Sequence, residues 1–332
     1  MATRVRLFDR SGILQYEANA PAFREFVLNG IGTANFVIKA KGLENYVAFG
    51  NYITIEHDTL PDVWVGNIVT PRPWDSRVIT VNAKSAMWIF SQRVGSYKQP
   101  ISGSWGSVFS QIIAVVNNAE LTPLQIGDYD DGAVVFSSTV DMSNVGTYLQ
   151  RALTQAGTRI DFRPVIQDGK LTIFVDLQPT LYTASELRLE EGLNIKDNTS
   201  VLIEQGEIYN DVTIMGIGLS QSKFTARAIN QESVDKFGLR QILFSEGQSQ
   251  ADVDRLAVVR LAQYDHPRAT LGMITMNKGD TFLSTSLGNS ANVELKTKGY
   301  LNGGSGFRGT TYIRTIQFDD KSGEAALVCQ EI

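Results

Sequence analysis

The sequence predicts a mainly β protein in which a small α+β module is inserted between two β-rich parts. Runs with a period of two fill the opening third, helical spacing and a hairpin signal dominate the middle, and strand-length runs return in the final third. The chain has 332 residues, of which 43% are hydrophobic. That composition is enough for a substantial core and for two or three domains, so we do not expect a disordered chain.

Short antiparallel strands are expected in the opening third. Gly30 and Gly32 precede the first run, and Pro71 and Pro73 separate the third run from the fourth. A small sandwich or barrel is the simplest arrangement of such strands. The runs are "ANFVIKA", "NYITIEHD", "DVWVGNIVT" and "SRVITVNAK".

The middle of the chain predicts helices and one hairpin. "KSAMWIFSQR" is long enough for about two helical turns and "SVFSQIIAVVNNAE" for three or more. Gly157 follows the best helix, "NVGTYLQRALTQAG", at the position of a left-handed C-terminal cap. Asp168 and Gly169 then separate two alternating runs, which is the strongest hairpin signal in the chain. The apolar stripe of the best helix consists of Val145, Tyr148, Leu149, Ala152, Leu153 and Ala156.

Strands return in the final third, interrupted by one helix. Ser249 is a good N-cap, Asp252 follows three residues later as in a capping box, and Pro267 ends the helix. Both ends of the chain are rich in strands, so an internal duplication remains open. The strand runs are "NDVTIMGIG", "ATLGMITMN", "ANVELKT", "TTYIRTIQFDD" and "EAALVCQEI".

The stretch "QESVDKFGLRQ" is either a ligand-binding turn or the corner of a strand. We interpret Gly238 as the residue that lets the chain turn between a buried Phe237 and the strand "LRQILF". Arg240 is expected to pair with an acidic residue at a domain or subunit boundary. This interpretation gives the stretch a structural role.

Charge and composition exclude several classes of protein. The formal net charge is −5 and no long basic run is present, which disfavours sequence-specific DNA binding. Cys329 is the only cysteine, so one chain has no disulfide framework or thiolate metal cluster. The first residues lack the apolar core of a signal peptide, and the longest apolar run is too short to span a bilayer. We therefore expect assembly inside a cell and no stable membrane insertion.

The common catalytic signatures are absent from the sequence. The two histidines, His57 and His266, lie at the ends of predicted elements, and no HExxH, Cys-x-x-Cys or G-x-S-x-G motif occurs. A pair of carboxylates brought together by folding, as in a glycosidase, leaves no local signature and stays open. We assign no catalytic, cofactor-binding or metal-binding residue and expect no cofactor.

Three loops can be compared with known calcium-binding and phosphate-binding motifs. "GDYDDGAVVF" resembles a calcium loop, but its glycine comes one position early and Thr139 replaces the closing glutamate, so an acidic turn is favoured. "SGSWGSVFSQ" lacks the ending of a P-loop, and "GYLNGGSGFRG" precedes a strand instead of a helix. We interpret the last as a flexible hairpin tip. The acidic turn contains Asp128, Asp130, Asp131 and Gly132.

The order of these features resembles that of bacteriophage tail-hub proteins. In that family a strand ending in Trp-x-Gly-x-Ile precedes another strand and a short helix, as in "VWVGNIVTPRPWDSRVITVNAKSAMWIFSQR". The helix and hairpin in the middle look like the small domain inserted in those proteins. A Ser-x-x-x-(Phe/Tyr)-Gly-x-Arg segment then precedes a helix beginning with Ser or Asp. The matching residues here are Ser233, Phe237, Gly238, Arg240, Ser249, Asp252 and Leu256.

The resemblance covers nearly the whole chain and implies two tube-type antiparallel β-barrel domains plus the α+β module. The first barrel would span residues 1–97, completed by strands of about 176–208. The inserted module would span 98–180, and the second barrel 181–332 with an inserted helix at 249–264. The chain ends at about the last barrel strand, which leaves no room for a peptidase, lysozyme or fibre extension.

The resemblance also implies a function and partners. Three chains would form a pseudo-sixfold ring at the tail tip or baseplate of a virion, assembled in the bacterial cytoplasm. Partners would be distal tail or tail tube proteins, the tape-measure protein, and tip or fibre proteins. DNA would pass through the ring without sequence-specific binding, and a mildly acidic wall would not retain it.

Two other functions compete with a structural hub. A carbohydrate-binding or receptor-binding tail module would use exposed aromatic faces, although Trp64 and Trp88 lie in patterns typical of a core. A cell-wall hydrolase is the third hypothesis, and it has no sequence signature. The aromatic candidates are Trp64, Trp74, Trp88 and Trp105.

Overall fold

The computed structural model divides the chain into two compact units, each described here by itself. The first unit comprises Met1–Ser200 and Leu271–Gln330, and the second comprises Val201–Thr270 with Glu331–Ile332. The structure describes residues 3–39, 46–58, 60, 62–69, 77–95, 99–129, 135–140, 144–195, 200–204, 208–216, 224–247, 249–266, 268–276, 285–296, 307–322 and 324–331.

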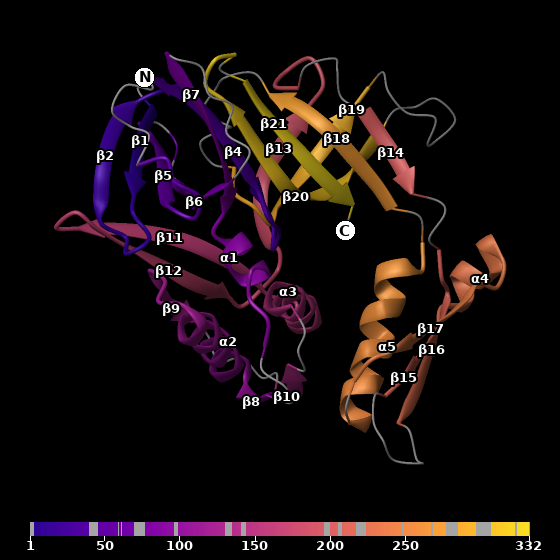
Figure 1. Ribbon diagram of the computed structural model, residues 1–332. Helices are drawn as coiled ribbons and strands as arrows, with labels where there is room; N and C mark the ends of the chain where they lie inside the picture. The colour runs from indigo at the N-terminus through magenta and orange to yellow at the C-terminus, as the bar shows by residue number, and fades with distance from the viewer. Residues whose placement is uncertain are drawn as a thin grey trace. The chain divides into compact units, whose positions relative to one another are not determined.

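Seven antiparallel strands form the first strand group, in the order β3-β4-β7-β6-β5-β1-β2 (Figure 1). Alternation places every second side chain of β4 inside, where Phe36 packs with Ile55, Trp64 and Ile79. The short strands predicted for the opening third are therefore confirmed. Their bounds are β1 (Thr3–Phe8), β2 (Leu14–Asn19), β3 (Ala22–Val27), β4 (Thr33–Lys39), β5 (Tyr52–His57), β6 (Trp64–Val69) and β7 (Val78–Ser85).

Six later strands form a second strand group that continues the same sheet, whereas the predicted run "NDVTIMGIG" belongs to a separate sheet. The order of the second group is β14-β18-β21-β20, with β19 pairing both β20 and β13. The mainly β class is confirmed, whereas among the described strands no ladder closes a barrel, so closure stays a prediction. The bounds are β13 (Thr183–Glu190), β14 (Ser200–Glu204), β18 (Arg268–Met276), β19 (Asn289–Leu295), β20 (Phe307–Asp319) and β21 (Glu324–Glu331).

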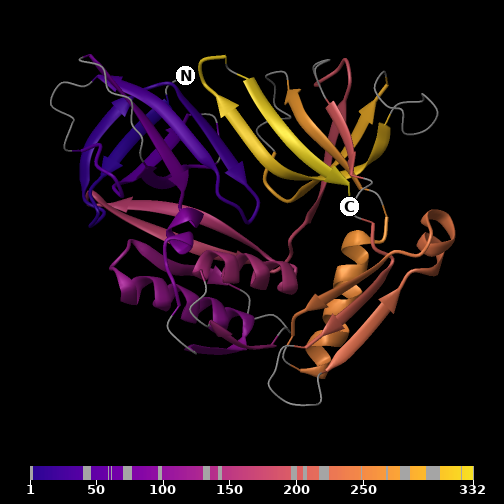
Figure 2. The same ribbon diagram turned by 45° about the vertical axis from the view of Figure 1, so that its right-hand side comes forward.

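β20 joins the two strand groups because its two halves have different partners. Residues 307–312 pair with β19, and residues 315–319 pair with β3 from the start of the chain. Figure 2 shows the indigo and yellow strands meeting at this strand. Strands that are nearly 300 residues apart in sequence therefore belong to one sheet.

A buried ion pair lies where β20 ends. The Asp320 carboxylate accepts hydrogen bonds from Thr3 Oγ1 at 2.6 Å, the Ala22 amide at 3.0 Å and Arg24 Nη1 at 2.9 Å. The Arg24 side chain is completely buried, and its guanidinium lies over the Phe318 ring at 5.3 Å. Burial by itself would raise the pKa of Asp320, but these three hydrogen bonds hold it below its ordinary value.

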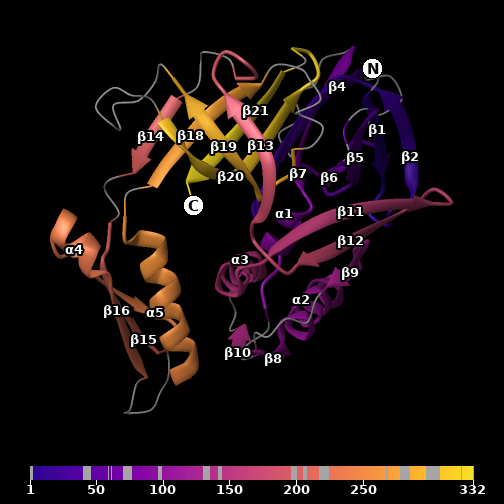
Figure 3. The ribbon, with the colours of Figure 1, turned by 180° about the vertical axis from the view of Figure 1, so that it is seen from behind.

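The predicted α+β module is present in the first unit. It contains two sheets, β11-β12-β9 and β8-β10, and Figures 1 and 3 show β11 and β12 between the first strand group and α2. The bounds are α1 (Met87–Ser91), β8 (Gln99–Ser104), α2 (Trp105–Ala119), β9 (Leu124–Tyr129), β10 (Val135–Val140), α3 (Val145–Ala156), β11 (Arg159–Gln167) and β12 (Lys170–Gln178).

Local signals in the module were predicted correctly at Gly157 and at Asp168-Gly169. Asn144 caps α3 by accepting the Thr147 amide, and Gly157 ends the helix with φ 65°. Asp168 and Gly169 have φ 50° and 73°, as a tight hairpin turn requires. α1 is shorter than the predicted two turns, because it has only five residues and ends at Ser91.

One hydrophobic core runs through the module and the first strand group. Phe8, Tyr52 and Val65 of the strands belong to the same cluster as Trp105 and Phe109 of α2. The core of the module therefore extends into the strand group, which also has a separate core around Phe36 and Trp64. The predicted division at residues 97 and 180 stays a prediction, since the compact units divide the chain at 200 and 270.

The second unit is a three-stranded sheet with one face covered by α5. Val212 and Ile214 of β15 pack with Val253 and Leu256 of the helix, and the order of strands is β16-β15-β17. The predicted helix at 249–264 is thus part of a small α+β unit, and Ser249 caps it as expected. The bounds are β15 (Asp211–Met215), β16 (Thr225–Ile229), α4 (Gln231–Phe237), β17 (Gln241–Ser245) and α5 (Gln250–Tyr264).

Replacing Asp320 with Asn is expected to destabilise the first unit by about 3 kcal/mol at pH 7, because it leaves the Arg24 guanidinium buried without its counter-charge. Since the folded pKa of Asp320 is lowered, its contribution is present above the unfolded pKa and is lost as pH falls through the folded pKa. Thermal unfolding between pH 7 and pH 3 measures this, and the difference from wild type should shrink at the acidic end.

Glu186→Gln is the matched control for that measurement, because Glu186 is exposed and forms no ion pair with any residue in the described ranges. If Asp320→Asn and Glu186→Gln unfold at the same temperature at pH 7, the ion pair does not hold β20 in place.

Candidate functional site

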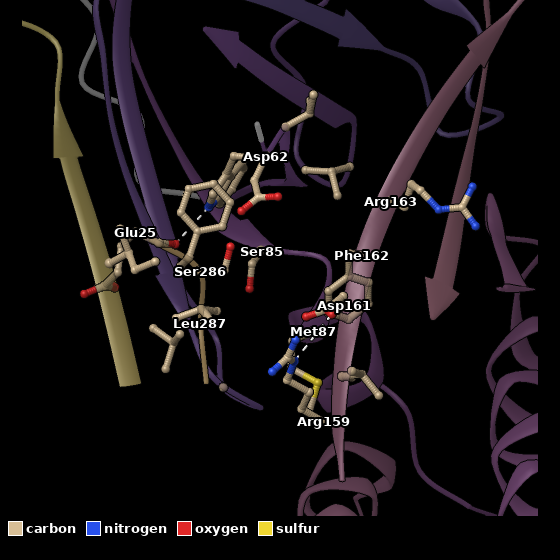
Figure 4. A pocket seen from close by; sticks show the side chains of 18 of the residues that line it. Glu25, Asp62, Ser85, Met87, Arg159, Asp161, Phe162, Arg163, Ser286 and Leu287 are labelled. Carbon is tan, nitrogen blue, oxygen red and sulfur yellow. Dashed lines mark hydrogen bonds and ion pairs between the residues drawn. The ribbon is translucent and has the colours of Figure 1, made fainter. Parts of the chain in front are cut away.

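A cavity of about 390 Å³ lies in the first unit, between β11 and the strands β3 and β6 (Figure 4). Trp64 forms part of its wall and donates its indole N–H to the Glu25 carbonyl at 2.9 Å, which ties β6 to β3. The charged residues of the lining are Glu25, Asp62, Arg159, Asp161, Arg163 and Asp176.

Two carboxylates face the cavity from different elements. Asp62 precedes β6 and Asp161 lies on β11, where Arg159 Nε is 3.6 Å from its carboxylate. Figure 4 shows both acidic side chains directed into the cavity, whereas Arg163 points away from it. Arg163 instead binds Asp176 at 2.9 Å.

The pKa values of both carboxyl groups are raised. Burial raises the pKa of Asp62, and the nearby charge of Asp161 raises it further. Burial also raises the pKa of Asp161, although Arg159 acts in the opposite direction. Because Asp62 is exposed and 39% of the Asp161 side chain is exposed, solvent screens both effects.

The cavity has the chemistry of a polar recess. No histidine lines it, and Ser85 Oγ accepts the Gly32 amide at 3.0 Å. Among the residues that the structure describes, no group of three or more His, Cys, Asp or Glu side chains could hold a metal ion. Its acids can attract a cationic or hydrogen-bonding group, but its lining holds no nucleophile paired with a base.

Both histidines lie at element ends, as predicted. His57 is the last residue of β5, and burial followed by the charge of Arg24 lowers its pKa. His266 follows α5, with Nδ1 2.5 Å from the Asp265 carboxylate. The two are in different units and neither lines the cavity.

The loops tested as binding motifs are only partly described. Asp128 ends up 3.4 Å from Arg163, while Asp130, Asp131 and Gly132 lie outside the described residues. In "SGSWGSVFSQ", Ser104 Oγ caps α2 by accepting the Ser107 amide. Residues 299–306 of "GYLNGGSGFRG" also lie outside the described residues, so the flexible tip stays a prediction.

Two of the four tryptophans are core residues. Trp64 is 1% exposed and Trp105 is 2% exposed, so the expectation that Trp105 could stack on a sugar was wrong. Trp105 is buried because α2 packs it against Phe109 and Thr158 accepts its indole N–H. Trp88 is half-buried, with its ring edge-on to Phe49, and Trp74 lies outside the described residues.

The stretch "QESVDKFGLRQ" forms a helix and its C-terminal cap. Gly238 has φ 78° and ψ 160°, a conformation that is almost restricted to glycine, so its predicted role as a turning residue is confirmed. Phe237 is half-buried, not buried, because α4 lies at the edge of the unit. The exposed Arg240 side chain forms no ion pair with any described residue, so its pairing across a subunit boundary stays a prediction.

Asn210 holds this stretch and was missed by the sequence reasoning. It is completely buried, donates from Nδ2 to the Gly238 carbonyl at 2.8 Å and accepts the Arg240 amide at 2.8 Å. A single Asn before a strand has no distinctive sequence signal. Its partners lie about thirty residues further along the chain, so only folding reveals the role.

The fold of this chain is that of phage tail proteins. It is similar to prophage tail protein gp18 from Listeria monocytogenes EGD-e (TM-score 0.61, 11% identity, 99% of this chain and 94% of that chain). It is similar to the 43 kDa tail protein of prophage MuSo2 from Shewanella oneidensis (TM-score 0.64, 13% identity, 100% and 98%). A tail protein from Neisseria meningitidis MC58 gives TM-score 0.64 at 12% identity, with 99% and 96% covered. No protein-family model and no curated protein matches the sequence.

Replacing Asp161 with Asn should lower the pKa of Asp62, because it removes the like charge that raises it. Carbon-detected NMR titration of the Asp62 carboxyl group in wild type and variant measures the midpoint. An unchanged midpoint would show that the two carboxylates do not interact across the cavity.

Replacing Gly238 with Ala should destabilise the second unit by about 1–3 kcal/mol, because a side chain is strained at this φ and ψ. A Cβ at this position meets no atom within 4 Å, so the cost is conformational and not a clash. Thermal unfolding followed by amide exchange in α4 and β17 measures it. Leu239→Ala at the neighbouring exposed position is the control and should have little effect.

Proposed function

We propose that this chain is a structural component of a phage tail tip or baseplate, where three copies form a hub ring that continues the tail tube. The main support is that the similarity to three phage tail proteins spans 99–100% of this chain. The similarity therefore includes both of its units. The likeness therefore concerns the whole architecture and not one common domain.

The arrangement of the sheet supports a structural role. The two strand groups are continuous through β20, and the α+β module shares one core with the first group. A wall that must hold its shape under load gains from such continuity, because separate barrels would move as independent bodies.

The proposed ring surrounds the end of the tape-measure protein, binds tail tube and tip or fibre proteins, and passes DNA without reading its sequence. The net charge of −5 supports passage, because cationic walls would retain DNA through counterion release. The chain would reach the virion by assembly in the bacterial cytoplasm. No helix in the described part of the chain is long and apolar enough to cross a membrane.

Light scattering coupled to size-exclusion chromatography is expected to give three times the chain mass of 36.6 kDa. Antibody labelling of purified virions should then place the chain at the tail tip in electron micrographs. Absence of the chain from purified virions would contradict the proposal. A capsid protein detected in the same preparation is the control for intact particles.

A further inference from the structure

Four exposed apolar side chains come together on loops of the first unit. Leu121 is 85% exposed, Val94 62%, Phe49 46% and Ile13 43%. We call these residues and Arg10 the loop patch. Large apolar side chains gathered in this way are typical of a surface that binds another protein.

Polar contacts connect the loops of the patch in pairs. Arg10 Nη2 donates to the Phe49 carbonyl at 3.1 Å, and Arg93 Nη2 binds Glu120 at 2.6 Å, directly before Val94 and Leu121.

Charged residues from both pairs of loops act on the Tyr52 phenol. Burial raises its pKa to about 12, and the charges of Glu120, Arg93 and Arg10 all act on it. Geometry supports the same arrangement, because a Cβ at Gly12 would lie 3.7 Å from the Pro123 Cβ, so the loop before Ile13 is next to the loop after Leu121.

The loop patch presents the exposed guanidinium of Arg10. The Arg93 guanidinium is neutralised by Glu120, whereas Arg10 is exposed and forms no ion pair within the described ranges. A matching surface should therefore be apolar and should present a carboxylate near Arg10.

The outer side of α5 has these properties. Four of its exposed residues, Ala251, Asp254, Val258 and Ala262, are three or four positions apart, so they lie along one side of the helix. The exposed Gln250 adjoins them, and its Nε2 donates to the Asp254 carboxylate at 2.8 Å. Val258 is 64% exposed, and Asp254 forms no ion pair with a residue that the structure describes. We call these four residues the α5 stripe.

The α5 stripe is unusual for a helix side that faces solvent. The opposite side buries Val253, Leu256 and Ala257 against the sheet of the second unit. Three of the four residues of the α5 stripe are apolar, although the solvent side of a surface helix is ordinarily polar. Small apolar residues around a single carboxylate allow close packing on a partner.

We infer that the loop patch of one copy binds the α5 stripe of the next copy, with Arg10 pairing with Asp254. The inference rests on the proposed ring and names the surfaces that join its members. Two unlike surfaces on one chain make a head-to-tail contact, which closes into a ring when the rotation between copies permits. The apolar side chains of both surfaces would be buried around the ion pair.

Exchanging the two charges tests this contact. Arg10→Asp and Asp254→Arg should each weaken association of the full chain at least about tenfold, because each places like charges together. The double variant restores opposite charges and should recover association to within about threefold of wild type. Analytical ultracentrifugation over a concentration series measures the association constants.

Two matched variants control for the change of surface charge. Arg151→Asp and Glu186→Arg alter exposed residues outside both surfaces and should leave association unchanged. Single variants that associate like wild type, or a double variant that does not recover, would overturn the contact. A trimer that persists in that case leaves the proposed ring intact.

If association of the chain is too weak to measure by ultracentrifugation, disulfide cross-linking tests the same contact. Leu121→Cys in one preparation and Val258→Cys in another are mixed under mild oxidation, so a heterodimer disulfide reports contact between copies. Cys329 does not compete, because it is completely buried and burial raises its pKa to about 12. If the chain stays monomeric and no heterodimer forms, the proposed contact is overturned. Imaging of virions tests the location of the chain separately.

Discussion

The first unit depends on β20 having two partners. Its early half pairs with β19 and its late half with β3, so the last strands of the chain complete a sheet begun by the first. Asp320, directly after β20, draws together Thr3, Ala22 and Arg24. A fully buried guanidinium costs free energy unless it is paired, so the sheet is stable only when this carboxylate is in place.

The second unit is held by a comparable interaction in the middle of its small sheet. Arg227 on β16 and Gln241 on β17 both donate to Asp211 on β15, which is 1% exposed. The hydrogen bonds from Arg227 lower the pKa of Asp211 below its ordinary value. One carboxylate thus links all three strands, and the opposite face is left to α5.

The cavity beside β11 and the exposed apolar surfaces would bind different kinds of partner. The described lining of the cavity includes the carboxylates of Asp62 and Asp161, which can attract a cationic or hydrogen-bonding group. The exposed apolar residues of the loop patch and the α5 stripe are the basis of the proposed contact with other chains. The fold is shared with phage tail proteins over the whole chain.

By itself the sequence determined the local structure: the Asp168-Gly169 hairpin, the Gly157 and Ser249 caps, and the strand runs all depend on neighbouring residues. Only the tertiary structure decided the rest. Periodicity marks β20 as a strand but carries no record of its two partners, since pairing joins residues nearly 300 positions apart. For the same reason Asp161, Asn210 and Arg10 gained a role only when folding brought distant segments beside them.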